Sequence, residues 1–208
     1  MNGKEEYILY MMERRLENIL VTGGAGFIGS NFIHYIFGET YFEGRIINVD
    51  KLTYAGNLEN LKDIDNKFKG ERYFFEKAVI GDFERMKNIF NKYNIDTVVN
   101  FAAESHVNRS IFGPKDFIQT NIMWTFTLLE VARENWKDRE NVLFHHISTD
   151  EVYGSIEEGG YFYEDTAYQP NSPYSASKAS SDHLVRAYYK TYGLPVTISN
   201  CSNYYGSY

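Results

Sequence analysis

The sequence predicts an α/β fold in which a doubly wound parallel sheet carries helices on both faces. Short apolar runs rich in branched residues alternate with stretches of helical periodicity, which is the pattern of a parallel sheet with crossover helices. The 208 residues suffice for one domain, since a domain typically takes about 100 to 200 residues. The predicted strands are residues 19–22, 46–49, 73–78, 97–101, 142–147 and 196–200.

Helical stretches separate these strands. The predicted helices include residues 27–37, 117–135 and 174–192. A further helix is predicted by apolar residues that recur on one helical face, namely Met86, Ile89, Phe90 and Tyr93. Gly193, followed by a proline two residues later, ends the last helix, as glycine just past a helix commonly does.

A glycine-rich turn follows the first strand and opens the first helix, which is the context that a dinucleotide site requires. The turn reads Gly23-Gly24-Ala25-Gly26-Phe27-Ile28-Gly29. Glycines let the backbone approach a pyrophosphate, whose charge the helix N-terminus meets. Asp50 ends the second strand, where a carboxylate binds the adenosine ribose and repels a 2′-phosphate. The turn therefore predicts a Rossmann-type domain that binds NAD, although the adjacent Lys51 could instead recruit phosphate.

Small or polar residues also follow the third and fourth strands. Asp82 could hydrogen-bond an adenine edge or cap a loop. Phe101 ends the fourth strand before two alanines that let a flat ligand approach, and it could equally pack in the core. The polar segment 104–110 comes next, at the carboxyl end where open α/β sheets bind ligands.

The histidines predict no metal site. His106 is expected to be structural. His145 and His146 are neighbours in a strand, so their rings point to opposite faces and cannot chelate one ion together.

An adjacent acid pair follows the fifth strand, and a Tyr/Lys pair opens the last helix. Asp150 and Glu151 come directly after Thr149, whose hydroxyl can reach a substrate; taken alone, the two acids could simply cap a loop. Tyr174 and Lys178 share one helical face. We therefore expect the ammonium to lower the phenol pKa from about 10 toward neutrality. Together these groups predict hydride chemistry combined with an elimination.

These motifs together resemble the extended short-chain dehydrogenase/reductase superfamily, and within it the dTDP-glucose 4,6-dehydratase family. The resemblance runs from Asn18 to about Asn203. The string Thr149-Asp150-Glu151 is its specific part, because related sugar epimerases share the glycines and the Tyr/Lys pair but are not expected to carry both acids. The matching segments are residues 21–30, 50–57, 102–107, 148–154 and 174–178.

The resemblance implies an NAD-dependent lyase that oxidises C4 of dTDP-glucose, eliminates water across C5 and C6, and returns hydride to C6. Tyr174, aided by Lys178, would take the 4-hydroxyl proton. Glu151 would then remove the C5 proton while Asp150 protonates the departing C6 hydroxyl. Thr149 would polarise the 4-oxygen.

Binding residues and an assembly are implied in the same way. The implied cofactor contacts are Gly23, Gly26, Phe27, Ile28, Gly29, Asp50, Lys51, Leu52, Thr53, Asp82, Phe83, Phe101, Ala102, Ala103, Thr120, Tyr174 and Lys178. The implied substrate contacts are Ser105, Thr149 and Asn203. The family also implies a homodimer packed through the helices near residues 117–135 and 174–192.

The chain departs from the family pattern at three places. Asn108 replaces an aspartate, which alters local charge. Tyr204 stands where a second asparagine would contact the nicotinamide region. After Tyr208 no further lobe of about 100 residues follows, so we expect the smaller substrate-binding lobe to be largely missing and the reaction impaired. Residues 1–17 are then an N-terminal extension and residues 18–208 the NAD-binding domain.

Composition excludes several function classes. The 21 Lys and Arg against 28 Asp and Glu give a formal charge of −7, which argues against a nonspecific nucleic-acid binder. The apolar run at residues 7–12 is too short for a secretory signal, and no stretch approaches a membrane span. A single cysteine, Cys201, excludes an intrachain disulfide and fits a reducing, cytoplasmic location.

Two other functions stay open. The chain could be another nucleotide-sugar epimerase or dehydratase, or a non-catalytic NAD-binding remnant. The acidic, glycine-containing segment 154–173 is expected to be either a flap beside the site or an ordinary exposed connection.

Overall fold

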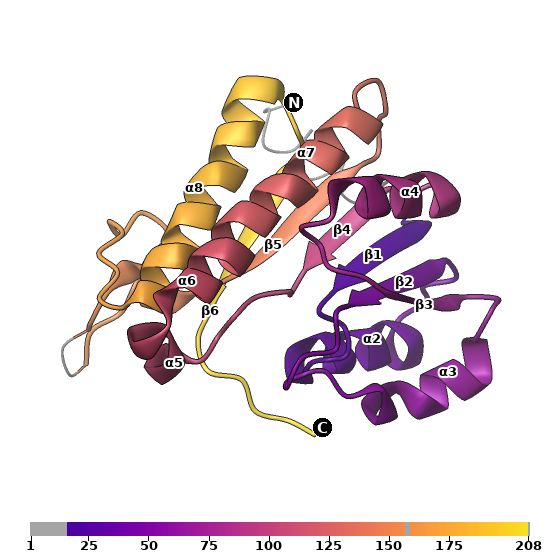
Figure 1. Ribbon diagram of the computed structural model, residues 1–208, viewed down its shortest axis with the longest axis horizontal. Helices are drawn as coiled ribbons and strands as arrows, with labels where there is room; N and C mark the ends of the chain where they lie inside the picture. Colours follow the sequence, from indigo (N-terminus) through magenta and orange to yellow (C-terminus); the bar gives the residue numbers. More distant parts are fainter. Residues whose placement is uncertain (1–15, 157–158, 208) are drawn as a thin grey trace.

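A computed structural model describes residues 16–156 and 159–207 as one six-stranded sheet with helices on both faces (Figure 1). The strand order is β3-β2-β1-β4-β5-β6, and every neighbouring pair is parallel. The strands are β1 (Asn18–Thr22), β2 (Arg45–Asp50), β3 (Tyr73–Lys77), β4 (Thr97–Asn100), β5 (Leu143–Thr149) and β6 (Val196–Cys201). This is the doubly wound order, which reverses direction between β1 and β4. All six predicted strands are confirmed, with ends shifted by two residues or fewer.

The helices are α2 (Phe27–Glu39), η1 (Leu58–Leu61), α3 (Lys62–Phe68), α4 (Phe83–Tyr93), α5 (Val107–Phe112), α6 (Pro114–Phe117), η2 (Ile118–Trp124), α7 (Thr125–Asn135), η3 (Asp150–Tyr153) and α8 (Pro173–Tyr192). The four predicted helices are confirmed. The one predicted at 117–135 begins earlier and contains η2, a π-helical segment. Sequence periodicity missed η1, α3 and α5. Residues 1–15 of the predicted extension lie outside the described residues.

Alternating strand residues build a separate core on each face of the sheet. On β1, Ile19 and Val21 pack with α2 and α3, whereas Leu20 packs with α4, α7 and α8. Figure 1 shows the same division, with α2 and α3 on one side of the sheet and α4, α7 and α8 on the other. Helix α4 turns the predicted apolar face inward, because Met86 and Ile89 are buried. In the described part of the chain, every helix is too short or too polar to span a bilayer.

The start of α8 is fixed by a capping box. Ser172 Oγ accepts a hydrogen bond from Ser175 N, and Ser175 Oγ accepts one from Ser172 N, each at 3.0 Å. These bonds satisfy two backbone donors that the first turn would otherwise leave unpaired. Pro173 occupies the first turn, where its fixed φ suits a helix. The capping box therefore fixes the start of α8 and, with it, the positions of Tyr174 and Lys178 in the helix.

We expect Ser172→Ala to lower the free energy of unfolding by about 1 kcal/mol, because the Ser175 amide loses its acceptor. Ser180→Ala is the matched control in the same helix, since its hydroxyl only bonds back to Ala176 O at 2.8 Å. Urea denaturation followed by circular dichroism measures both variants. An equal loss of unfolding free energy in the two variants would contradict the assigned role of the cap.

Candidate active site

A cavity of about 740 Å³ lies along the carboxyl ends of the strands. The segments that follow all six strands line it, together with residues near the starts of α2 and α8. The structure brings all the predicted site residues to this cavity wall except Leu52, Asp82 and Phe83. Residues far apart in the sequence therefore meet in one place, as expected for a parallel sheet.

The three exceptions have structural positions of their own. Asp82 caps α4 by accepting a hydrogen bond from Arg85 N at 3.0 Å. Of the two roles expected for it, an adenine contact or a cap, the cap is therefore present. Phe83 packs against the core of the α4 face, with Lys87 above its ring. Leu52 has a left-handed backbone, with φ of 57°, in the turn after β2. Their cofactor contacts stay predictions.

The glycine-rich turn packs against the loop after β4. A Cβ added at Gly23 would lie 2.9 Å from both Cα and N of Ala102, and Gly23 has a φ of 69°. Only glycine meets both demands without strain. Gly26 differs, because its φ is −81° and a Cβ there would meet only Gly23 O at 3.3 Å and Ala55 O at 3.9 Å. The cavity therefore reaches the backbone at Gly26.

The N-terminus of α2 opens onto this space. Gly26 is its N-cap and makes no side-chain cap bond, and the first turn carries no acidic residue. Unpaired amides and the positive end of the helix dipole favour an anionic group there. The turn can thus hold a phosphate group without a basic side chain.

Asp50 is held beneath the turn. Its Oδ2 accepts a hydrogen bond from Ala25 N at 3.1 Å, and its Oδ1 accepts one from Leu52 N at 2.7 Å. Lys51 also lies at the wall, with Nζ 3.4 Å from Glu104 Oε1 and 4.5 Å from the centre of the Trp124 ring. The Asp50 carboxylate is fixed at the cavity wall, whereas the Lys51 charge is already paired. This arrangement favours a ribose hydroxyl over a 2′-phosphate.

The acid pair lies in the turn after β5. Thr149 provides the cap of η3 by accepting a hydrogen bond from Glu151 N at 3.3 Å. The neighbouring hydroxyl thus makes the capping bond of this turn, and Asp150 Oδ1 accepts a hydrogen bond from the same hydroxyl at 3.4 Å. Burial and the nearby charge of Asp150 raise the pKa of Glu151. A carboxylate of raised pKa at a cavity wall is suited to accept a proton.

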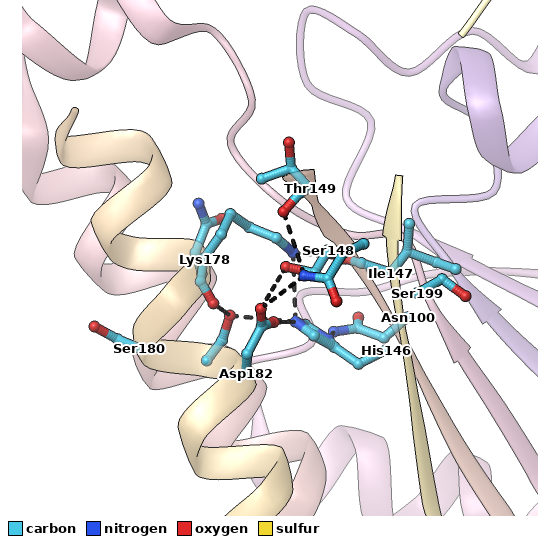
Figure 2. A network of polar contacts seen from close by, with 12 residues as sticks. Asn100, His146, Ile147, Ser148, Thr149, Lys178, Ser180, Asp182 and Ser199 are labelled. Carbon is cyan, nitrogen blue, oxygen red and sulfur yellow. Dashed lines mark hydrogen bonds and ion pairs between the residues drawn. The ribbon is translucent and has the colours of Figure 1, made fainter. Parts of the chain in front are cut away.

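Tyr174 and Lys178 lie opposite the turn that carries the acids. Burial, followed by the charge of Glu151, raises the pKa of Tyr174 to about 12, although a hydrogen bond with Thr149 acts the other way. Burial lowers the pKa of Lys178 to about 8. Its Nζ donates to Ile147 O at 2.7 Å (Figure 2). The expected lowering of the phenol pKa is therefore wrong for this structure, because burial and the charge of Glu151 raise this pKa and Lys178 is not among the groups that shift it.

His145 and His146 have different partners on the two faces of the sheet, as predicted, whereas the structural role expected for His106 stays a prediction. His106 is the N-cap residue of α5 and makes no side-chain cap bond. His145 bonds Thr197 at 2.7 Å, whereas His146 bonds Asn100 at 3.1 Å beneath the cavity. Within residues 16–156 and 159–207, no three metal-ligating side chains lie close enough to hold an ion.

Several wall residues were missed by the sequence reasoning. They include Trp124 and Cys201. Trp124 stands in η2, and a Cβ on Gly81 would collide with its ring, so that glycine was the only available signal. Ile156 and Phe162 also line the cavity, so the segment after Tyr153 forms part of its rim.

Comparison with known proteins assigns the chain to a family. The family model described as GDP-mannose 4,6 dehydratase matches residues 20–208. A dTDP-glucose 4,6-dehydratase of Escherichia coli is 55% identical over 204 residues, which is 91% of this chain and 55% of the relative. The dTDP-glucose 4,6-dehydratase of Haemophilus influenzae is 54% identical, over 92% of this chain and 57% of its own. The chain thus spans about half the length of the curated relatives it matches.

Solved structures agree with this assignment. The dTDP-glucose 4,6-dehydratase of Bacillus anthracis in complex with NAD superposes with a TM-score of 0.80 at 47% identity, covering 92% of this chain and 56% of that one. A UDP-glucose 4-epimerase of Thermotoga maritima gives a TM-score of 0.74 at 31% identity, covering 87% and 54%. The dehydratase is more similar than the epimerase by both measures. With a family model that covers nearly all of its residues, this chain belongs to the GDP-mannose 4,6 dehydratase family.

Proposed function

We propose that this chain is the NAD-binding part of a dTDP-glucose 4,6-dehydratase, with residues 18–208 forming the NAD-binding domain. The observation that carries the proposal is the position of Asp150 and Glu151, on the wall of the same cavity as Tyr174 and the glycine-rich turn. An epimerase carries out no elimination and therefore needs no such acid pair. The named dehydratases are also the more similar relatives.

The residues at the cavity fit NAD. The N-terminus of α2 and the open backbone at Gly26 would hold the pyrophosphate, and Asp50 would bind the adenosine ribose. Ala102, packed against the turn, would leave room for a flat ring. When bound, NAD accepts a hydride from C4 of the sugar and returns it to C6. Ser105 and Asn203 line the cavity and are proposed as substrate contacts.

The protein side chains would move the protons. Tyr174 would take the proton of the 4-hydroxyl, while Thr149, its hydrogen-bond partner, would contact the same oxygen. The resulting 4-ketone acidifies C5, so elimination follows oxidation. Glu151 would take the C5 proton, and Asp150 would give a proton to the C6 hydroxyl, which leaves as water. The raised pKa of Glu151 supports this role because a general base works best near the ambient pH.

We expect Gly26→Ala to weaken NAD binding at least about tenfold while leaving the melting temperature nearly unchanged. The φ of −81° accepts alanine, but the methyl group would occupy the space proposed for the pyrophosphate. Gly38→Ala is the matched control in the same helix, because a Cβ there meets nothing within 4 Å. Calorimetric titration with NAD measures the affinity of both variants for the cofactor. Unchanged affinity in Gly26→Ala would argue against this binding mode.

Incubation with NAD and dTDP-glucose is expected to yield the 4-keto-6-deoxy sugar, one water lighter than the substrate, by mass spectrometry. Glu151→Gln should reduce its formation by about 100-fold or more, because the C5 base is lost. Glu164→Gln, in an exposed segment, is the matched control. A product epimerised at C4 with C6 intact would favour an epimerase. NAD binding without turnover at high substrate concentration would favour a non-catalytic NAD-binding unit.

We also propose a homodimer formed through α7 and α8. Phe126 on α7 and Tyr189 and Tyr192 on α8 are exposed large apolar side chains, and such groups are enriched at protein interfaces.

Light scattering should give twice the chain mass, and Phe126→Asp should give a monomer because a buried unpaired charge opposes association. Tyr41→Asp, fully exposed after α2, should leave the dimer intact. A monomeric wild type at all concentrations tested would refute the dimer.

The cytoplasmic location stays a prediction, which cell fractionation would test.

A further inference from the structure

A buried polar network lies beneath the Tyr/Lys pair and joins β1, β4 and β5 to α8 (Figure 2). Thr22 Oγ1 donates to Asn100 Oδ1 at 2.6 Å, and Asn100 Nδ2 contacts His146 Nδ1 at 3.1 Å. His146 Nε2 lies 3.2 Å from Ser181 Oγ, which donates to Lys178 O at 2.8 Å. The network thus ends at the backbone of the active-site lysine.

The direction of these bonds sets the state of His146. The Asn100 oxygen already accepts from Thr22, so its amide group is the donor toward the ring. Nδ1 of His146 faces this donor, and Nε2 lies 3.2 Å from Ser181 Oγ and 3.4 Å from Lys178 Nζ. Complete burial and the neighbouring charge of Lys178 lower the pKa of His146 well below its usual range. The ring is neutral and balances no charge.

Asp182 supplies the carboxylate of the network. It lies one turn after Lys178 on the same face of α8 and is 2% exposed. Its Oδ2 accepts hydrogen bonds from Ser148 Oγ at 2.7 Å, Tyr168 OH at 3.1 Å and Asn200 Nδ2 at 3.3 Å. Its Oδ1 has no hydrogen-bond partner and lies 3.5 Å from His146 Nε2. Burial raises the pKa of Asp182, whereas the charge of Lys178 and these three donors act the other way and favour the ionised carboxylate.

Lys178 needs such a counter-charge. Its side chain is 3% exposed, and burial of an ammonium favours the neutral amine. The titratable groups that surround it are His146 on β5, Cys201 on β6, and Tyr174 and Asp182 on α8. Asp182 Oδ1 and Lys178 Nζ lie 3.5 Å and 3.4 Å from the same atom, His146 Nε2, so the two buried charged groups lie close together. The negative charge of Asp182 opposes the effect of burial on Lys178 more strongly than that of Cys201.

We propose that Asp182 is a positioning residue, whose carboxylate, held by Ser148, Tyr168 and Asn200, keeps Lys178 in its ammonium form at the cavity wall. Charged Lys178 can stabilise the phenolate of Tyr174, whereas the neutral amine cannot. The consequence for Tyr174 rests on the proposed function. The pairing of Lys178 with Asp182 does not, because both groups belong to the chain itself.

The pairing is tested on the chain without cofactor or substrate. NMR of protein labelled with ¹³C at lysine Cε gives the titration midpoint of Lys178, whose signal is assigned by its loss in Lys178→Met. The wild-type midpoint is expected near pH 8. Asp182→Asn should lower it by about one unit or more, because the shape is kept and the opposite charge is removed. The same substitution at exposed Asp138 is the matched control and should leave it unchanged. An unchanged midpoint in folded Asp182→Asn would overturn the proposal.

A double variant covers the case in which Asp182→Asn does not fold. Removing one member of a buried pair leaves an uncompensated charge, whereas removing both does not. Lys178→Met combined with Asp182→Asn should therefore unfold at a higher temperature than Asp182→Asn alone. A double variant that is no more stable than this single one would overturn the proposal. The outcomes are independent of NAD binding and turnover, which test the proposed function separately.

Discussion

The common direction of all six strands decides where the chemistry of this chain lies. In the parallel register, Thr22 of β1 pairs with Asn100 of β4, and Thr149 of β5 pairs with Cys201 of β6. Each strand therefore ends at the same edge, and the segments after β2, β4, β5 and β6 carry polar residues to the cavity there. Closest contact occurs where the strand order reverses, because Gly23 after β1 leaves no space for a side chain beside Ala102 after β4. One topological rule thus joins a phosphate cradle, an acid pair and a Tyr/Lys pair in one cavity.

Strand positions were predictable because branched apolar runs fill a sheet that is buried on both faces. The missed elements lacked such a signal. Helix α3 has the sequence Lys-Asp-Ile-Asp-Asn-Lys-Phe and buries only Ile64, so its short length shows no period. The π-helical turns of η2 shift the register inside a continuous helix, and this shift depends on packing of Thr120 and Asn121 rather than on local preference. Asn121 bonds both Glu104 and Ser177, which no local pattern could indicate.

The site was predictable as far as motifs follow strand ends, and less so where burial decides. The positions of Tyr174 and Lys178 at one wall follow from helical spacing. Their protonation states do not follow from helical spacing. These states depend on how deeply each group is buried and on the charges of Glu151 and Asp182, which the folded chain brings near them. Asp182 itself looks like an ordinary helical acid in the sequence. Its burial becomes visible only once β5, β6 and the segment before α8 supply its three donors.

A buried tyrosine at the wall creates an electrostatic conflict that the rest of the pocket must resolve. With a pKa of about 12, the Tyr174 phenolate would be a strong base but would seldom form near neutral pH. The acid pair deepens the conflict, since the ionised Glu151 that could serve elimination also opposes the phenolate. A positive charge nearby is the physical remedy, and Lys178 provides one only while it stays protonated in a buried position. Keeping that charge calls for a buried carboxylate nearby, and although Asp182 also raises the pKa of Tyr174, its effect there is smaller than those of burial, Glu151 and Asp150. The pairing of Asp182 with Lys178 meets this requirement, so the network under the sheet edge belongs to the chemistry as much as to the fold.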